Sequence, residues 1–177
     1  PADCVYLGLH HLCPQPPTAV VSGINRGSNL GQDVHYSGTV AAAHEAALAG
    51  FPALAVSLAL DIEPGEVQHW DTAARLARQT LEQMLTRPLP PSTVVNLNVP
   101  NRPLEKVEGL KVTTMGFERY EIKVSQQRDP RGRAYYWLGG RARPLDTTPG
   151  TDEYWLSRGY ATLTPLTSDR TCRNSIA

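Results

Sequence analysis

The first hundred residues alternate between two hydrophobic patterns. Three short runs are largely apolar, and the first of them, residues 18–24, is rich in β-branched residues, as is typical of a strand buried on both faces of a parallel sheet. Three other segments repeat apolar residues at helical spacing. The predicted order is helix 3–12, strand 18–24, helix 39–49, strand 53–59, helix 70–85 and strand 93–99. This alternation predicts an α/β fold in which helices cover a mostly parallel sheet.

The helix over residues 70–85 separates apolar and polar positions most clearly. One side carries alanines, leucines and a tryptophan, and the other carries arginines and glutamines, so one face is expected to pack against the sheet. The predicted apolar face consists of Trp70, Ala73, Ala74, Ala77, Leu81 and Leu85.

After Pro103 the pattern changes to short, strand-like segments. The expected strands cover residues 110–114, 122–126, 134–138 and 160–166. Asp129-Pro130-Arg131-Gly132 has the composition of a tight turn and predicts a hairpin, and Thr151 is expected to cap a short helix. We therefore divide the chain into residues 1–103, a Rossmann-like α/β unit, and residues 104–177, a hairpin-rich section with a C-terminal tail.

Charge and composition argue against several partners. The 17 basic and 17 acidic side chains cancel and the pI is near 7.4, so no overall field attracts nucleic acid or an acidic membrane surface. No apolar run approaches the roughly 18 residues of a membrane span. Cys4, Cys13 and Cys172 have no metal-like spacing. We expect a cytoplasmic protein with neither a nucleic-acid polymer nor a membrane as partner.

The candidate chemistry lies where the strand over residues 18–24 ends. Ligands of open α/β sheets bind beyond the carboxyl ends of the strands, and a helix N-terminus there binds phosphate readily. Ser37 and Thr39 at the following helix start would add hydroxyl groups, and Gly38 would let an anion approach the backbone. Gly23, Gly27 and Gly31 match neither the dinucleotide motif nor the P-loop. A turn capped by Ser or Thr, without a ligand, is the alternative.

Three further side chains near this turn have two interpretations each. Asn25 follows the strand directly, and its amide oxygen suits Mg²⁺, Mn²⁺ or Ca²⁺, but it equally suits bracing of the turn. His35 is a candidate catalytic acid or a loop-packing residue. Tyr36 is a candidate to stack on a nucleobase or to anchor the loop.

Residues 20–31 and 33–43 read VVSGINRGSNLG and DVHYSGTVAAA, a long and specific motif. Further segments agree in chain order: PADCV at 1–5, NLNVP at 96–100, DPRGRAYYW at 129–137, Thr151-Asp152, and Gly159-Tyr160 through Thr164-Pro165-Leu166. Together they resemble the survival protein SurE family over nearly the whole chain. One segment, Thr114-Met115-Gly116-Phe117-Glu118-Arg119, departs from it, because many relatives carry more arginines there.

The resemblance implies a three-layer α/β/α fold and a divalent-metal-dependent phosphatase that hydrolyses nucleoside 5′- and 3′-monophosphates and, in some members, polyphosphate. It implies one Mg²⁺ or Mn²⁺ per subunit, with Asn25 as a metal ligand. It maps phosphate contacts onto Asn29, Ser37, Gly38 and Thr39. The family assembles into dimers or tetramers through C-terminal hairpins, so residues 104–177 are expected to serve oligomerisation.

Two observations lead us to expect that part of the protein precedes Pro1. Proline suits the first position of a helix, so the chain opens within a helical turn. The family's Asp-Asp metal ligands lie on its first strand, and no Asp-Asp pair occurs in this chain. We expect the first βα units to be missing and residues 1–177 alone to be inactive. The alternatives are a catalytically inactive nucleotide- or phosphate-binding protein and a purely structural assembly protein.

Overall fold

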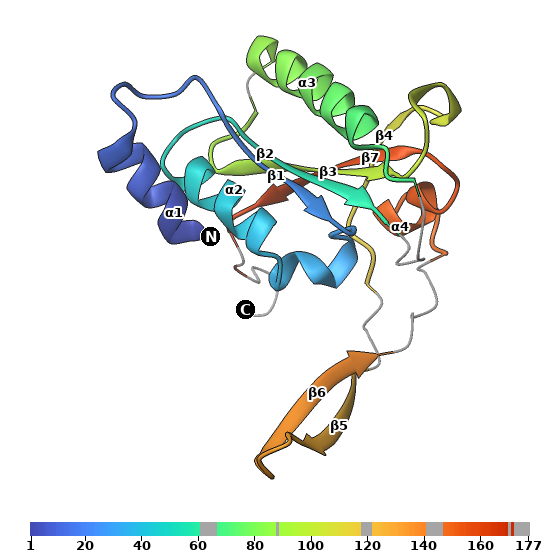
Figure 1. Cartoon of the computed structure of the whole chain (residues 1–177). Helices are drawn as coiled ribbons and strands as arrows, with labels where there is room; N and C mark the ends of the chain where they lie inside the picture. Colours follow the sequence, from blue (N-terminus) through green and yellow to red (C-terminus); the bar gives the residue numbers. More distant parts are fainter. Residues whose placement is uncertain (61–66, 88, 118–121, 141–146, 170, 172–177) are drawn as a thin grey trace, which may run out of the picture.

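A computed structural model gives the fold of the chain (Figure 1). The structure describes residues 1–60, 67–87, 89–117, 122–140, 147–169 and 171. The elements in order are α1 (Ala2–Leu7), the π-helical turn η1 (Gly8–Leu12), β1 (Val20–Arg26), the 3₁₀ helix η2 (Gly31–His35), α2 (Gly38–Leu48), β2 (Ala53–Ala59), α3 (Trp70–Thr86), β3 (Thr93–Pro100), the 3₁₀ helix η3 (Leu104–Lys106), β4 (Leu110–Val112), β5 (Ile122–Arg128), β6 (Ala134–Gly140), α4 (Asp152–Leu156) and β7 (Ala161–Thr167).

A five-stranded sheet in the order β1-β2-β3-β7-β4 forms the centre of the molecule. Strands β1, β2 and β3 are parallel, β7 runs antiparallel to β3, and β4 pairs in parallel with β7. Helices α1 and α2 cover one face of the sheet and α3 covers the other (Figure 1). The predicted three-layer, mostly parallel α/β fold is confirmed.

Alternating side chains of β2 serve the two helix layers. Leu54, Val56 and Leu58 are fully buried in the cluster that contains the apolar residues of α3. Ala53 and Ala55 point the other way, into the cluster that contains those of α2. Since burying one Leu or Val side chain contributes about 1.5–3 kcal/mol, this strand is a large part of the core. The next α2-side position of β2 is Ser57, which is also fully buried.

The ends of α2 match the sequence prediction. Ser37 is the N-cap, and its Oγ accepts a hydrogen bond from the N–H of Val40 at 3.1 Å. At the other end Gly50 has φ +91°, its N–H donates to Ala47, and the N–H of Phe51 donates to Ala46. These two bonds form a Schellman motif, which explains why the helix stops at this glycine.

Two sequence predictions about burial are wrong. On α3 the buried residues are Thr72, Ala73, Leu76, Ala77, Thr80 and Met84, whereas Ala74 and Leu85 are exposed. Two buried threonines lie on this face, and a pattern of apolar residues alone does not count them. Strand β1 is not buried on both faces, because it lies at the edge of the sheet and Val21 remains 47% exposed.

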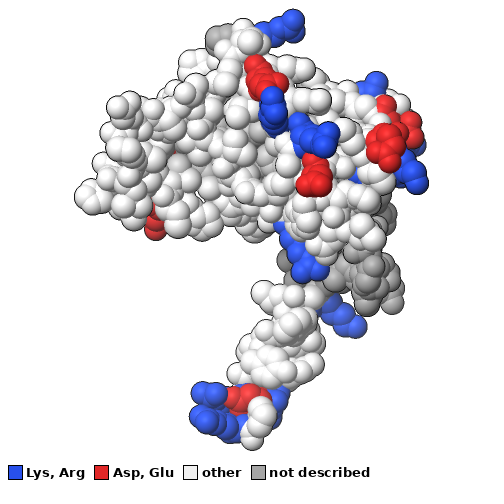
Figure 2. All heavy atoms as spheres, turned by 45° about the horizontal axis from the view of Figure 1, so that its top comes forward, with Lys and Arg blue, Asp and Glu red and all other residues white. Residues whose placement is uncertain are grey.

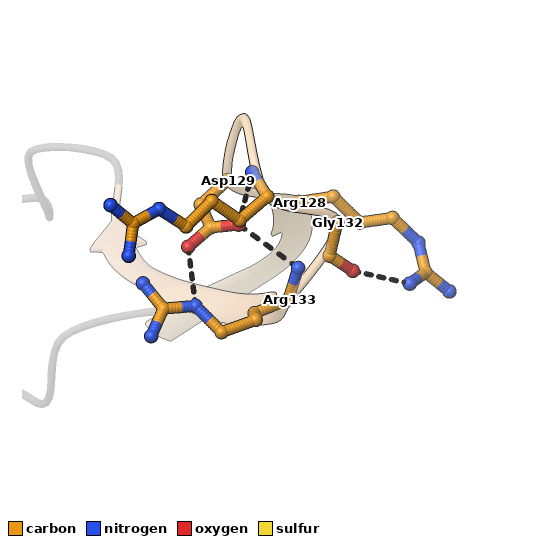
Figure 3. Close-up of polar contacts among 5 residues, drawn as sticks. Arg128, Asp129, Gly132 and Arg133 are labelled. Carbon is orange, nitrogen blue, oxygen red and sulfur yellow. Dashed lines mark hydrogen bonds and ion pairs between the residues drawn. The ribbon is translucent and has the colours of Figure 1, made fainter.

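The section over residues 104–177 contributes to two structures. Strands β4 and β7 complete the main sheet and α4 packs beside it, whereas β5 and β6 form a separate antiparallel hairpin that projects from the body (Figure 1). The predicted turn at its tip is confirmed: the Asp129 carboxylate accepts hydrogen bonds from the N–H groups of Arg131 and Arg133 and from the Arg133 side chain (Figure 3). Arg128 donates to the Gly132 carbonyl oxygen at 2.8 Å.

On the face of the body shown in Figure 2, acidic and basic side chains lie next to one another in one region, and much of the rest carries no charge. Arg78 and Glu82 on α3 form an ion pair of exposed side chains. The hairpin tip differs, because its arginines gather around a single aspartate (Figure 2). In the described part of the chain, no helix is both long and apolar enough to cross a membrane.

Candidate phosphate and metal site

The candidate site lies at the carboxyl ends of the parallel strands, where β1 leads into the loop of residues 27–30. We call residues 25–31 the signature loop. It passes from the end of β1 over the ends of β2 and β3, and η2 then leads the chain to the start of α2. Gly23, just before it, has φ +127°, and a Cβ there would lie 2.3 Å from the Val56 carbonyl oxygen. Only glycine permits β1 and β2 to approach each other so closely.

Asn25 and Thr39 meet at this edge. The Thr39 hydroxyl donates to Asn25 Oδ1 at 3.3 Å, and Asn25 Nδ2 donates to the Gly27 carbonyl oxygen at 2.9 Å. The amide therefore braces the turn, as one interpretation of the sequence predicts. An amide oxygen accepts two hydrogen bonds or ligands, so Oδ1 retains one lone pair beside the helix start.

The first turn of α2 presents unused donors to the same place. Within the described chain, the N–H groups of Gly38 and Thr39 donate to no atom, since the cap bonds begin at Val40. Two free N–H groups and the helix dipole favour an anion there. Pro1 packs against Gly38, and a Cβ on that glycine would lie 2.8 Å from the proline ring.

Asn29 lies apart from this group and points into the protein. It is 7% exposed, and its Nδ2 donates to Ser57 Oγ at 2.6 Å. Its backbone is held by Asn98, whose Oδ1 accepts from the Asn29 N–H at 2.8 Å and whose Nδ2 donates to the Asn29 carbonyl oxygen at 3.0 Å. Asn96 donates to the same carbonyl oxygen at 2.8 Å. The structure thus gives the Asn29 amide nitrogen a buried partner, Ser57, at the centre of the signature loop.

Asn96 and Asn98 are positioning residues that the sequence analysis did not single out. Both are fully buried on the α2 side of β3, where they follow Val94 at intervals of two residues. The alternation of Asn96, Leu97, Asn98 and Val99 is a signal of a strand with one polar face. A buried polar face without nearby chain partners predicts that some distant segment must satisfy it.

His35 and Tyr36 end η2 on the surface. His35 is exposed, and the Tyr36 side chain is 90% exposed directly before the N-cap Ser37. Neither side chain anchors the loop by burial. Both are accessible to a ligand that occupies the start of α2.

Asp152 holds the far end of the signature loop. It is 0% exposed, and its carboxylate accepts three backbone hydrogen bonds of 2.9 Å from the N–H groups of Gly31, Gly116 and Glu153. Burial raises the pKa of the Asp152 carboxyl above its ordinary value, and the three N–H donors oppose that shift. The sequence analysis noted Asp152 only as part of a motif, because its partner Gly31 lies 121 residues away.

The described residues do not form a cation site by themselves. Among them, no three His, Cys, Asp or Glu side chains converge in a way that would hold a metal ion. Asn25 Oδ1 is a hard oxygen of the kind that Mg²⁺ and Mn²⁺ accept, but it is a single neutral ligand. The structure therefore shows one compatible oxygen and no complete coordination sphere among the described residues.

Comparison with known proteins identifies the family. Residues 1–122 match the family model described as survival protein SurE. The chain belongs to the SurE family. This SurE chain is 46% identical over 171 residues to a protein of Halorhodospira halophila named 5′-nucleotidase SurE, which covers 97% of the chain and 67% of that relative. It is 46% identical over 175 residues to a protein of Escherichia coli named 5′/3′-nucleotidase SurE, with 99% and 67% covered.

A solved structure agrees with the SurE fold. The crystal structure of the SurE protein from Aquifex aeolicus superposes with a TM-score of 0.78 at 34% identity, covering 99% of this chain and 69% of that one. The resemblance inferred from the sequence motif is thus confirmed. The chain spans about two thirds of the length of the relatives it matches.

Proposed function

We propose that this SurE chain forms the phosphate-binding part of a phosphatase that acts on nucleoside 5′- and 3′-monophosphates. The observation that carries the proposal is the meeting of the Asn25 amide with Thr39 and the free N–H groups at the start of α2. This arrangement offers dipoles to a phosphoryl group without a large positive field, in keeping with the neutral net charge. The names of the relatives support a nucleotidase activity.

The proposal assigns one divalent cation, Mg²⁺ or Mn²⁺, to each subunit, with Asn25 Oδ1 as one ligand. Such an ion would offset the charge of the phosphate. The described residues provide no acidic cluster, so the remaining ligands and the catalytic carboxylates must come from outside them. We also propose that residues 1–177 alone do not hydrolyse nucleotides, because the family's Asp-Asp pair does not occur in this sequence. Polyphosphate, a longer chain of the same phosphoryl groups, is a second substrate class for the same site.

The exposed residues beside the helix start suggest how the nucleoside is held. Tyr36 is accessible over most of its surface and adjoins the cap of α2, which supports the proposal that its ring stacks on a base. Aromatic stacking is tolerant of base identity. His35 precedes Tyr36 and is also exposed. It is the candidate for proton transfer to the leaving oxygen.

The hairpin is proposed as the contact between subunits. Isolated two-stranded hairpins are at best marginally stable in water, yet this one exposes a run of large apolar side chains. They are Val124, Tyr135, Tyr136, Trp137 and Leu138. A second copy of the chain that covers this face in a dimer or tetramer would bury them, and Tyr and Trp are enriched in such interfaces.

Two substitutions in the full-length protein test the site. Asn25→Ala should reduce turnover of a nucleoside monophosphate at low metal, with recovery in excess Mn²⁺, because one metal ligand is lost. Thr39→Ala should raise the inhibition constant of free phosphate by about tenfold, the effect of one good hydrogen bond to an anion, because the Thr39 hydroxyl is proposed to turn from Asn25 Oδ1 to the phosphate. Asn101→Ala is the control, because Asn101 lies at the same edge but holds His69 and Val67 instead. Unchanged metal dependence in Asn25→Ala and unchanged phosphate inhibition in Thr39→Ala would contradict the proposal.

A protein that binds nucleotides without hydrolysing them is the second candidate. It is favoured by the lack of an acidic cluster among the described residues. Titration calorimetry separates the two functions. Binding of a nucleoside monophosphate by the full-length protein in Mn²⁺ without release of phosphate would establish the inactive binding protein.

A further inference from the structure

The Asp152 carboxylate joins three segments that are far apart in the chain. Its Oδ2 accepts from Gly31, the last residue of the signature loop, at 2.9 Å. Its Oδ1 accepts at 2.9 Å from Gly116, after β4, and from Glu153 in α4. All three donors are backbone N–H groups, so the contact fixes the course of the chain itself.

Other bonds tighten the same junction. The Asp152 N–H donates to the Thr114 carbonyl oxygen at 2.9 Å, and the Thr114 N–H donates to Gly150 at 3.1 Å. Gly31 has φ +47°, and a Cβ there would lie 2.8 Å from Glu153 Oε1 and 2.9 Å from the Gly116 carbonyl oxygen. The backbone at Gly31 therefore lies close to both other segments, and a shift of this residue would disturb its bond to Asp152.

Burying a carboxylate at this junction is unfavourable unless the protein needs both of its oxygens as hydrogen-bond acceptors. Burying a charge costs free energy, and burial raises the pKa of Asp152. A neutral Asn has one acceptor oxygen and one NH₂ group, so it cannot accept from both Gly31 and the pair Gly116 and Glu153. Only a carboxylate satisfies the three N–H groups at once.

We propose that Asp152 is a positioning residue for the phosphate site: it fixes the end of the signature loop so that Asn25 and the start of α2 keep the geometry that binds phosphate. The inference rests on the proposed function. Asp152 touches neither phosphate nor metal, and it acts through the Gly31 N–H. The loop is thus held at two points, by Asn98 at Asn29 and by Asp152 at Gly31.

The test uses the full-length protein and a pair of neighbouring substitutions. Asp152→Asn keeps the shape of the side chain but turns one acceptor into a donor that faces a backbone N–H. Thr151→Ala is the matched control, because Thr151 is also buried and caps the same helix by accepting from the Tyr154 N–H, but it does not touch Gly31. The readouts are kcat and KM for a nucleoside 5′-monophosphate and the inhibition constant of inorganic phosphate, measured where all variants are folded by circular dichroism.

Asp152→Asn should raise the phosphate inhibition constant and KM in parallel by about tenfold, the effect of one lost charge-assisted hydrogen bond, whereas Thr151→Ala should stay within about twofold. Equal shifts in the two variants would mean that Asp152 only stabilises α4, and this would overturn the inference. If the wild type is active and Asp152→Asn has the same KM and phosphate inhibition constant, the inference is also overturned. A wild type that neither hydrolyses nucleotides nor binds phosphate would overturn the proposed function as well.

If Asp152→Asn does not fold, amide hydrogen exchange of the wild-type protein decides the matter. Inorganic phosphate should slow exchange at Gly31 and Gly116 together, because one carboxylate holds both N–H groups. Slower exchange at the start of α2 with no change at Gly31 and Gly116 would overturn the inference.

Discussion

Replacing Asn98 by alanine should destabilise the protein more than replacing Asn96 by alanine. The two residues form a closely matched pair, because both are fully buried asparagines on the same face of β3, two positions apart. Either substitution removes the same atoms. The two amides differ in what they do for the Asn29 backbone.

Asn98 holds both polar groups of that backbone, at 2.8 Å and 3.0 Å, whereas Asn96 only adds a second donor to the Asn29 carbonyl oxygen. Without Asn96, that carbonyl oxygen keeps a donor, and the Asn96 Oδ1, which has no partner among the described residues, disappears. Without Asn98, the buried Asn29 N–H loses its acceptor. An unsatisfied buried donor costs about 1–3 kcal/mol, and this is the expected difference in the free energy of unfolding.

Urea unfolding of the two variants measures this difference directly. With a slope of about 2 kcal/mol per molar urea, the midpoint of Asn98→Ala should lie about 0.5–1.5 M below that of Asn96→Ala. Coincident midpoints, or a lower midpoint for Asn96→Ala, would refute the argument that the Asn29 N–H depends on Asn98.

Two further predictions concern other parts of the molecule. Gly31→Ala should destabilise the protein more than Gly27→Ala, because both glycines have positive φ but only a Cβ at Gly31 would meet atoms closer than 3 Å; equal urea midpoints would contradict this. Leu138→Ser on the hairpin should shift the full-length protein toward smaller species in analytical ultracentrifugation, because it removes apolar surface from the proposed subunit contact. Val112→Ser on β4 is the control, because the Val112 side chain (74% exposed) is as accessible as that of Leu138 (73% exposed) but does not belong to the hairpin. An equal effect of the two substitutions would reject the hairpin as the contact.

The elements that the sequence predicts well are those whose signals are local. Strand β2 was predicted with its observed bounds, because a short apolar run between turns that carry glycine and proline has few alternatives. Both ends of α2 follow from Ser37 and Gly50, whose capping bonds reach only three or four residues. The alternation of helical and strand patterns predicted the α/β fold, the family motif implied the same fold, and the solved relative confirms it.

The parts that escaped prediction depend on partners far along the chain. Asn98 satisfies Asn29 from 69 residues away, and Asp152 satisfies Gly31 from 121 residues away. No periodicity marks such pairs, because each is one side chain meeting one peptide group. The buried face of α3 was mispredicted for a related reason. Thr72 and Thr80 are buried on that face, and a hydrophobic pattern counts threonine as polar.

Because of these long-range contacts, different residues hold the signature loop in place and bind the anion. Ser37 and Thr39 belong to α2, whose position is fixed by its own cap and by packing on β2. Beyond the pairing of Asn25 and Arg26 with β2 and the Gly27 N–H, which bonds to Leu58, the signature loop has no strand partner among the described residues. Amides of β3 and the carboxylate of Asp152 hold it there instead. Changes at Asn98 or Asp152 should therefore alter stability and the affinity for phosphate together, whereas changes at Thr39 should alter affinity alone. If Thr39→Ala lowered the urea midpoint as much as Asn98→Ala, this division between holding the loop and binding the anion would be wrong.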